Sequence, residues 1–329
     1  MKVTNESGVS LPLAVWLLHD DYDYVEGVEN YISVTRLMKP LRQIIIPPRI
    51  PPEEQTTDVT DFIARKLGHA IHDSIEKSWK QGYERSLKML GIPADVVANV
   101  KLNPTLQECR AHNDIIPVYL EQRAISQLDG FNIGGKFDMV SDGIVNDFKS
   151  TSAWSWAKGT RDEDHILQMS LYRWIDSKQE HRKITEEYGR INYVFTDWSK
   201  AMARSNPKYP QHRVEHKDLV LMSLADTERW ISAKLSQMLA NWGTPEAELP
   251  ECTDEELWRS DPVFKYFSDP LKSQQPGARS TRNFDSLSGA RSHMVEKGGK
   301  GAVITVPGEV KACGYCPAFE GCTQKDQYL

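Results

Sequence analysis

The chain has 329 residues, a formal net charge of −6 and a hydrophobic content of 40%. This composition is typical of a soluble globular protein with a core, and the length allows one large domain or a domain with an appendage. The apolar run over residues 11–18 is too short to span a bilayer and lacks the flanks of a signal peptide, so no membrane partner is expected. A negative net charge is unusual for a nucleic-acid binder, but an enzyme needs only a local basic track.

The pattern of the chain predicts three parts. We expect an N-terminal segment over residues 1–55 with a short strand near residues 42–46, a core over residues 56–245, and a C-terminal segment over residues 246–329. Helical and strand patterns are mixed, which predicts an α/β fold with a small central sheet flanked by helices.

A long helix is predicted early in the core, because apolar residues recur every four positions from Ile63 to Trp79 and form one stripe to be buried. His72 lies beside this stripe, one turn after Gly68, where a glycine lets another backbone or a ligand approach closely. An imidazole in this position can complete a metal's coordination shell, although a lone histidine there is more often a satisfied core residue. His69 is the rival candidate.

The central part of the chain predicts a β-hairpin, with strands over residues 133–140 and 144–150 joined by an Asp-Gly turn. Asp147 and Lys149 then point to the same side, close to Asp138. Carboxylates at this density repel one another unless a cation neutralises them, and their hard oxygen ligands suit Mg²⁺ or Mn²⁺. The alternative is a solvated hairpin face with an ordinary ion pair.

Two weaker candidates flank the hairpin. Residues 163–176 predict a helix on which Gln168 and Tyr172 share one face, where they can contact a phosphate or form an ordinary polar edge. Glu121 lies upstream and can bind a metal through a water, but a solvated helix residue is the favoured interpretation.

Two segments are candidate tracks for a nucleic acid. Residues 154–161 interleave tryptophans with basic residues, which can stack on bases and hold phosphates. Residues 279–283 are rich in arginine, and Arg291, Lys297 and Lys300 follow them. Ordinary loop chemistry and core tryptophans are the alternative for both segments.

The C-terminal segment contains a C-x₂-C-x₅-C pattern formed by Cys313, Cys316 and Cys322. Thiolates this close together suit zinc or an iron–sulfur cluster, both of which usually take four protein ligands. We choose Cys252 as the fourth, because Thr253 and Glu256 form a capping box that places it at the start of a helix, whose dipole favours a thiolate. Cys109 is the alternative fourth ligand. Disulfides fit poorly, since the cysteines are odd in number and the chain looks cytosolic.

In chain order these motifs resemble the RecB-like branch of the PD-(D/E)XK nuclease superfamily, which includes phage-encoded exonucleases and the CRISPR-associated and AddB-type nucleases. The matching residues are Gly68 and His72, then Gly135, Lys136 and Asp138, then Asp147 and Lys149, then Gln168 and Tyr172, and finally the cysteines. Any one motif is weak, but their shared order is specific.

The resemblance implies a role for each matching position. His72, Asp138, Asp147 and the carbonyl of Phe148 would hold Mg²⁺ or Mn²⁺, and Lys149 would assist the attacking water. Gln168 and Tyr172 would contact the nucleic acid or support the site. A 4Fe–4S cluster, with Zn²⁺ as the alternative, would be held by Cys252, Cys313, Cys316 and Cys322.

Two departures from the family pattern stand out. Cluster-bearing relatives often carry their first cysteine near the start of the domain, whereas residues 32–43 here contain none. No G-x₄-G-K-[ST] helicase motif is present, which indicates a stand-alone nuclease.

The resemblance therefore implies a metal-dependent DNase, foremost a single-strand-preferring exonuclease of phage or prokaryotic DNA recombination, repair or degradation. It would act in the cytoplasm of a bacterial or phage-infected cell, alongside an unknown recombination or replication protein. A structure- or site-specific endonuclease and a catalytically inactive DNA-binding module are the alternatives. The sequence leaves open the cleavage polarity, DNA versus RNA, strand preference and oligomeric state.

Overall fold

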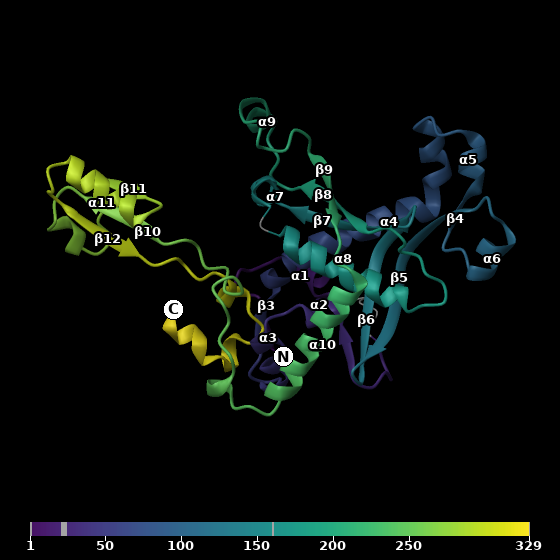
Figure 1. The fold of residues 1–329 in the computed structure, drawn as a ribbon, viewed down its shortest axis with the longest axis horizontal. Coiled ribbons are helices and arrows are strands. Elements are labelled where there is room, and N and C mark those ends of the chain that lie inside the picture. The colour runs from purple at the N-terminus through teal and green to yellow at the C-terminus, as the bar shows by residue number, and fades with distance from the viewer. Residues whose placement is uncertain (1, 21–24, 160, 329) are drawn as a thin grey trace. The chain divides into compact units, whose positions relative to one another are not determined.

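The computed structural model of the chain describes residues 2–20, 25–159 and 161–328. The chain forms two compact units (Figure 1), one of residues 1–39 with 55–239 and the other of residues 40–54 with 240–329. Residues 40–54 thus group with the C-terminal unit, whereas the sequence pattern assigned them to an N-terminal segment. None of the described helices is long and apolar enough to cross a membrane.

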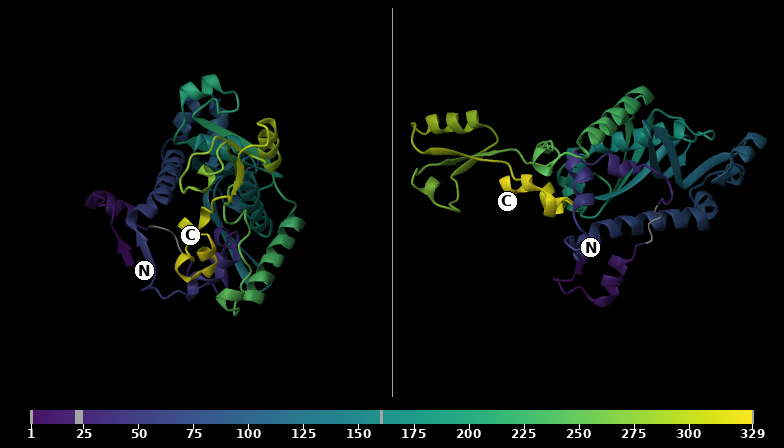
Figure 2. Two further views of the ribbon diagram at one scale, coloured as in Figure 1. Left: turned by 90° about the vertical axis from the view of Figure 1, so that its left-hand side faces the viewer. Right: turned by 90° about the horizontal axis from the view of Figure 1, so that it is seen from below.

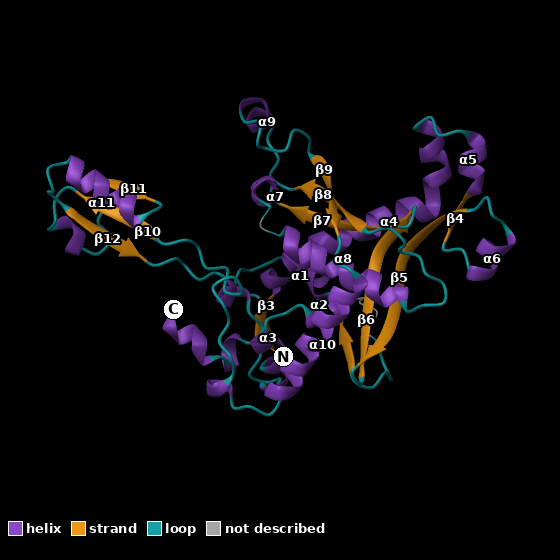
Figure 3. Cartoon of the chain, in the orientation of Figure 1, coloured by secondary structure: helices purple, strands orange, loops and turns teal. Residues whose placement is uncertain are grey.

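The first unit is built on a mixed sheet with the strand order β4-β5-β6-β7-β8-β9, in which β2 also pairs with β6 (Figure 3). Its strands are β2 (Tyr31–Ser33), β4 (Val100–Leu102), β5 (Ile116–Leu128), β6 (Phe131–Ser141), β7 (Ile144–Thr151), β8 (Tyr188–Phe195) and β9 (Val214–Val220). The β5–β6, β6–β7 and β8–β9 pairs are antiparallel, and the β2–β6, β4–β5 and β7–β8 pairs are parallel. The predicted mixed α/β class is confirmed. Outside this sheet, β1 (Lys2–Thr4) pairs with β3 (Thr56–Asp58).

The predicted hairpin is formed by β6 and β7. Asp142 and Gly143 in its turn both have positive φ angles, 52° and 75°. A two-residue turn with both φ angles positive matches the right-handed twist of the flanking strands, which explains the Asp-Gly sequence. Two acidic residues of the candidate site lie on this hairpin, Asp138 on β6 and Asp147 on β7.

The helices of the first unit are α1 (Leu11–Leu18), α2 (Val34–Leu37), α4 (Ile63–Met89), α5 (Ala94–Asn99), α6 (Leu106–Ala111), α7 (Ala153–Lys158), α8 (Asp162–Ser177), α9 (Lys200–Ser205) and α10 (Leu224–Asn241), the last of which runs into the second unit. The long helix α4 is seen along its length in the right-hand view of Figure 2. The prediction of α4 is confirmed, but its stripe is not wholly buried, because Ile63 and Leu67 are 41% and 47% exposed. Further along α4, Trp79 packs on the cluster of Val118, Leu120 and Met139.

Helix α8 confirms the helix predicted over residues 163–176. Acidic residues occupy its first turn, where they interact favourably with the positive end of the helix dipole. Leu171 and Trp174 on its inner side are fully buried, and the helix lies against β5 and β6. Helix α8 therefore covers one face of the sheet with its buried side.

The second unit contains α3 (Leu41–Ile45) and an antiparallel sheet of β11 (Arg282–Phe284), β10 (Val263–Phe267) and β12 (Ala302–Val306), against which α11 (Leu287–Glu296) packs. The strand expected near residues 42–46 is wrong, because these residues form α3. Its isoleucine run has strand propensity, but Leu41, Ile44 and Ile45 are buried at a helical spacing. Packing on this face outweighs local propensity.

Gly135→Ala should destabilise the first unit. A Cβ atom at Gly135 would lie 2.6 Å from Cε1 of Tyr172, a ring that is only 6% exposed and has little room to move. Overpacking of this kind costs about 1–3 kcal/mol of unfolding free energy. The matched control is Gly82→Ala in α4, where nothing lies within 4 Å of the new Cβ and alanine favours the helix. Equal urea midpoints for the two variants would contradict this packing.

Candidate functional site

Three carboxylates lie side by side on neighbouring strands of the first unit. In the β5–β6 register, Leu120 pairs with Met139 and Gln122 with Phe137, so Glu121 lies opposite Asp138. On β7, Asp147 directly follows Asn146, the last residue in this direction that pairs with β6. Opposed residues of an antiparallel pair share one face of the sheet. Glu121 also has a φ of 52°, a conformation rarely adopted by non-glycine residues and often found at functional sites.

The strands β6 and β7 separate at this point, and side chains take over the hydrogen bonds of the Phe148 backbone. The Phe148 N–H donates to Asp138 Oδ2 over 3.0 Å. The Phe148 carbonyl lies 2.8 Å from His72 Nε2, and His72 Nδ1 lies 3.4 Å from Asp138 Oδ1. Asp138, His72 and the Phe148 backbone thus form one closed network that joins α4 to the hairpin.

Both ring nitrogens of His72 face acceptors, which favours the imidazolium form. Burial lowers the pKa of His72, but the hydrogen bond and charge of Asp138 and the Phe148 carbonyl outweigh it, and the net pKa is raised. A protonated His72 neutralises Asp138 from the side on which the two residues face each other.

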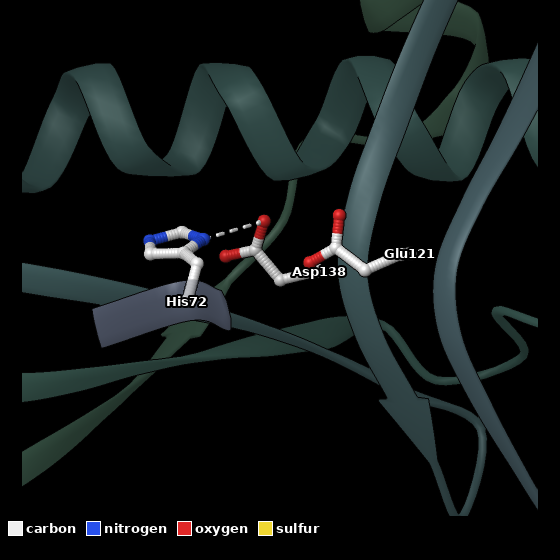
Figure 4. Close-up of side chains that lie close together, drawn as sticks. All are labelled: His72, Glu121 and Asp138. Atoms are coloured by element: carbon white, nitrogen blue, oxygen red, sulfur yellow. Dashed lines mark ion pairs between the residues drawn. The ribbon is translucent and has the colours of Figure 1, made fainter. Parts of the chain in front are cut away.

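The ligand atoms of His72, Glu121 and Asp138 all lie within 4.8 Å of one another (Figure 4). An imidazole with two carboxylates suits a divalent cation such as Mg²⁺ or Mn²⁺. Asp147 adjoins this group and is 2% exposed. The donor set fits a divalent cation.

Two lysines balance these acids. Lys149 Nζ lies 2.7 Å from Asp147 Oδ2, and Lys136 Nζ lies 2.7 Å from Glu121 Oε2. Burial raises the pKa of Asp147 to about 6, opposed by Lys149 and reinforced by the charge of Asp138. Burial lowers the pKa of Lys149, but the charge of Asp147 outweighs this effect and raises it, so Lys149 stays protonated.

The Gln–Tyr pair supports the site from α8. Gln168 Nε2 donates to the Tyr172 hydroxyl over 2.9 Å, and the Tyr172 ring packs against Gly135 of β6. Tyr172 is buried, so it holds α8 against the strand that carries Asp138. His165, which the sequence analysis did not single out, is also buried on α8, and burial and the charge of Lys149 lower its pKa to about 4.

The structure corrects the interpretation of Glu121. The sequence favours a solvated helix residue at this position, but Glu121 lies in β5 and its side chain is only 19% exposed. The signal that would have found it is the strand-like pattern from Ile116 onward. Its partnership with Asp138 depends on the strand register, which no local pattern contains.

Both tryptophans of the first candidate track, residues 154–161, pack against other aromatic side chains. Trp156 of α7 packs edge-on against Phe195 and under the Lys217 ammonium. Trp154 is 42% exposed and packs edge-on against Tyr209. Thr160 of this segment lies outside the described residues.

In the second unit, the buried guanidinium of Arg42 ties together the chain around the cysteines. Arg42 donates to Cys322 Sγ over 3.4 Å, to the Leu249 carbonyl over 2.9 Å, to the Pro250 carbonyl over 3.0 Å and to the carboxylate of Glu246. It is only 3% exposed. One side chain from residues 40–54 therefore joins the segments that lead to Cys252 and Cys322.

A second clamp acts on Cys252 itself. Its backbone N–H donates to Gln324 Oε1 over 2.9 Å, and Gln324 Nε2 donates back to its carbonyl over 3.1 Å. Cys252, Cys313, Cys316 and Cys322 are half-buried in this unit and form no disulfide within the described residues. Cys109 belongs to the first unit, where its Sγ lies 3.7 Å from the Tyr119 hydroxyl.

The helix expected after Cys252 is wrong. The capping-box hydrogen bonds between Thr253 and Glu256 do form, but residues 254–258 make a single turn. No helix dipole lowers the pKa of the Cys252 thiol. Burial, reinforced by Glu256, Cys322 and Cys316, raises that pKa to about 12. A cation would have to stabilise the thiolate.

The chain was compared with protein families, curated proteins and solved structures. No protein-family model and no curated protein matches it. Among solved structures, the crystal structure of SSO0001 matches with a TM-score of 0.38 and 17% identity, over 72% of this chain and 86% of that one. A phage related exonuclease from Haemophilus somnus 129PT matches with a TM-score of 0.25 and 12% identity, over 62% and 95% of the two chains. TM-scores this low carry no functional argument, so the function has to be argued from the site.

Arg42→Met should destabilise the second unit strongly. The variant leaves the Glu246 carboxylate without its buried partner and frees the carbonyls of Leu249 and Pro250. Removing one member of a buried ion pair costs about 3 kcal/mol or more of unfolding free energy. Arg49→Met is the matched control, because the exposed Arg49 also donates to carbonyls of this unit. An equal loss in both variants, measured by urea unfolding, would argue against the clamp.

Proposed function

We propose that this protein is a metal-dependent DNA nuclease with a PD-(D/E)XK-type core. The observation that carries the proposal is the row of Glu121, Asp138 and Asp147 on adjacent strands, with His72 and Lys149 beside it. The order of the motifs along the sequence supports the same conclusion. The resemblance adds DNA as the substrate.

The residues divide into metal ligands and a charged donor. His72, Glu121, Asp138, Asp147 and the Phe148 carbonyl would hold Mg²⁺ or Mn²⁺. When bound, such an ion supplies Lewis-acid activation of the scissile phosphate and lowers the pKa of a water. Glu121 joins the ligand set proposed from sequence because of its position opposite Asp138.

Lys149 is the residue suited to stabilise the transition state. Its ammonium is held 2.7 Å from Asp147 and remains protonated, so it can donate to the phosphate oxygen on which charge develops. In the hydrolysis the water oxygen loses a proton and bonds to phosphorus, the ester P–O bond breaks, and the leaving oxygen takes up a proton, so that one water is added overall. Gln168 and Tyr172 act as positioning residues through the packing of α8 on β6.

An exonuclease that prefers single strands remains the proposed mode, and the family resemblance alone supports it. The endonuclease and the inactive binding module are the competing functions. The proposed cellular setting, in phage or bacterial DNA recombination, repair or degradation, rests on the resemblance in the same way.

Asp138→Asn and Asp147→Asn should each abolish most cleavage, because each removes a charged ligand, and Lys149→Ala should slow turnover about 10²-fold or more. The measurement is digestion of end-labelled DNA with Mg²⁺, Mn²⁺ or EDTA. The matched control is Asp142→Asn, which makes the same chemical change in the exposed hairpin turn and should retain activity.

The same assay separates the competing functions. Survival of circular single-stranded DNA while the linear form is degraded supports an exonuclease, and rapid loss of the circle supports an endonuclease. Wild-type protein that binds DNA without cleaving it would leave only the binding module.

We further propose that Cys252, Cys313, Cys316 and Cys322 hold one 4Fe–4S cluster, with zinc as the alternative. The four cysteines belong to the same unit, and Arg42 donates to Cys322 Sγ; both observations support this proposal. Serine at any of these positions should lower the metal content and the thermal stability, because metal binding is partly folding free energy. Cys109→Ser is the control and should change neither.

Elemental analysis of anaerobically purified protein decides between iron and zinc, and an unchanged metal content in Cys252→Ser would rule out that ligand.

A further inference from the structure

The small sheet of the second unit gathers basic residues from separate loops at one end. The register pairs Tyr266 near the end of β10 with Arg282 at the start of β11, and Phe267 with Ala302 at the start of β12. The loops over residues 268–281 and 297–301 therefore meet at the same end of the sheet. The basic side chains they bring there are those of Lys272, Arg279, Arg282, Lys297 and Lys300, which we call the basic edge.

Specific contacts hold these loops in place. The Tyr266 hydroxyl donates to the Lys300 carbonyl over 2.9 Å, and the Thr281 N–H donates to the Tyr266 carbonyl over 2.9 Å. The Ser268 N–H donates to the Thr281 hydroxyl over 3.0 Å. The glycines at 298, 299 and 301 have positive φ angles, which let the loop turn tightly between Lys297 and Lys300. The basic edge is thus built on an ordered backbone.

The cations of the basic edge are exposed and unneutralised. Across the described chain, no carboxylate forms an ion pair with any of these side chains, although ion pairs are frequent in the first unit. Among the acids nearby in sequence, Asp269 accepts from the Leu271 N–H and Glu296 pairs with His293. Asp285 is exposed and forms no ion pair within the described residues. Arg282 lies over the Phe284 ring, 5.0 Å from its centroid, which presents its guanidinium at the surface.

We propose that the basic edge binds the phosphate backbone of the DNA that the nuclease acts on. The inference rests on the proposed function for the identity of the polyanion. A chain of net charge −6 that leaves its cations unpaired at one end of a sheet has a local surface complementary to phosphates. Lysine and arginine on flexible stems bind phosphates without reading base sequence.

The test compares two variants with equal changes in net charge. The first replaces Arg279, Lys297 and Lys300 by Gln. The second replaces Lys80, Lys101 and Lys178 by Gln, which are exposed lysines of the first unit already paired with glutamates. Binding of a labelled oligonucleotide to the full-length protein is measured by fluorescence polarisation in EDTA, so that no cleavage occurs, over a series of salt concentrations.

The basic-edge variant should bind DNA about tenfold more weakly, and the slope of log K against log salt should fall by about 2, since each phosphate contact to a single strand contributes about 0.7. The control variant should bind like the wild type, and both should keep the wild-type melting temperature. If both variants lose the same DNA affinity, the loss comes from the change in net charge alone, and the proposal is overturned. Polyglutamate that competes as well as unlabelled DNA would assign the surface to an acidic protein instead.

Failure of this inference is distinguishable from failure of the proposed function. If the basic-edge variant binds and cleaves DNA like the wild type, the nuclease stands and the basic edge has no part in binding. If the wild type never cleaves DNA but loses binding through these substitutions, the basic edge stands and the nuclease assignment falls.

Discussion

The candidate site depends on the separation of β6 and β7 at Phe148. Beyond their last backbone pair, the Phe148 N–H bonds to Asp138 and its carbonyl lies against His72. A buried peptide group left without partners would cost free energy comparable to a lost hydrogen bond, so these side chains are needed for the fold as well as for the chemistry. The same network joins α4 to the hairpin. Any process that draws Asp138 toward a cation must reorganise this contact.

The electrostatics of the site show why a cation fits it. Asp147 is buried next to Asp138, and its pKa rises to about 6 because burial disfavours its charge. Lys149 and Lys136 each neutralise one carboxylate from the side, and His72 faces a third. These three positive groups reduce the repulsion among the carboxylates. Groups held with unfavourable burial at one place are characteristic of functional sites, where stability is given up for activity.

The second unit solves a different problem, because it must hold thiols together with little regular structure around them. Arg42 and Gln324 do this through carbonyl and sulfur contacts rather than through a large hydrophobic core. Arg42 comes from residues 40–54, which explains why this segment groups with the C-terminal residues and not with its sequence neighbours. A bound metal would reinforce the same connections, since its ligands lie on the segments that these side chains already join.

The sequence by itself determined the local elements and the identity of the chemical groups. The Asp-Gly turn and the apolar spacing of α4 and α8 act within a few residues, so the hairpin and both helices could be predicted. Asp138, Asp147 and Lys149 could be predicted as neighbours from the hairpin, whereas His72 was placed with them only through the family resemblance. Tertiary structure decided what depends on register and packing. It placed Glu121 opposite Asp138 in β5, turned the isoleucines after Pro40 into a buried helix, and made Arg42 a partner of Cys322. These contacts join residues far apart along the chain, and their free energy comes from burial that no short pattern encodes.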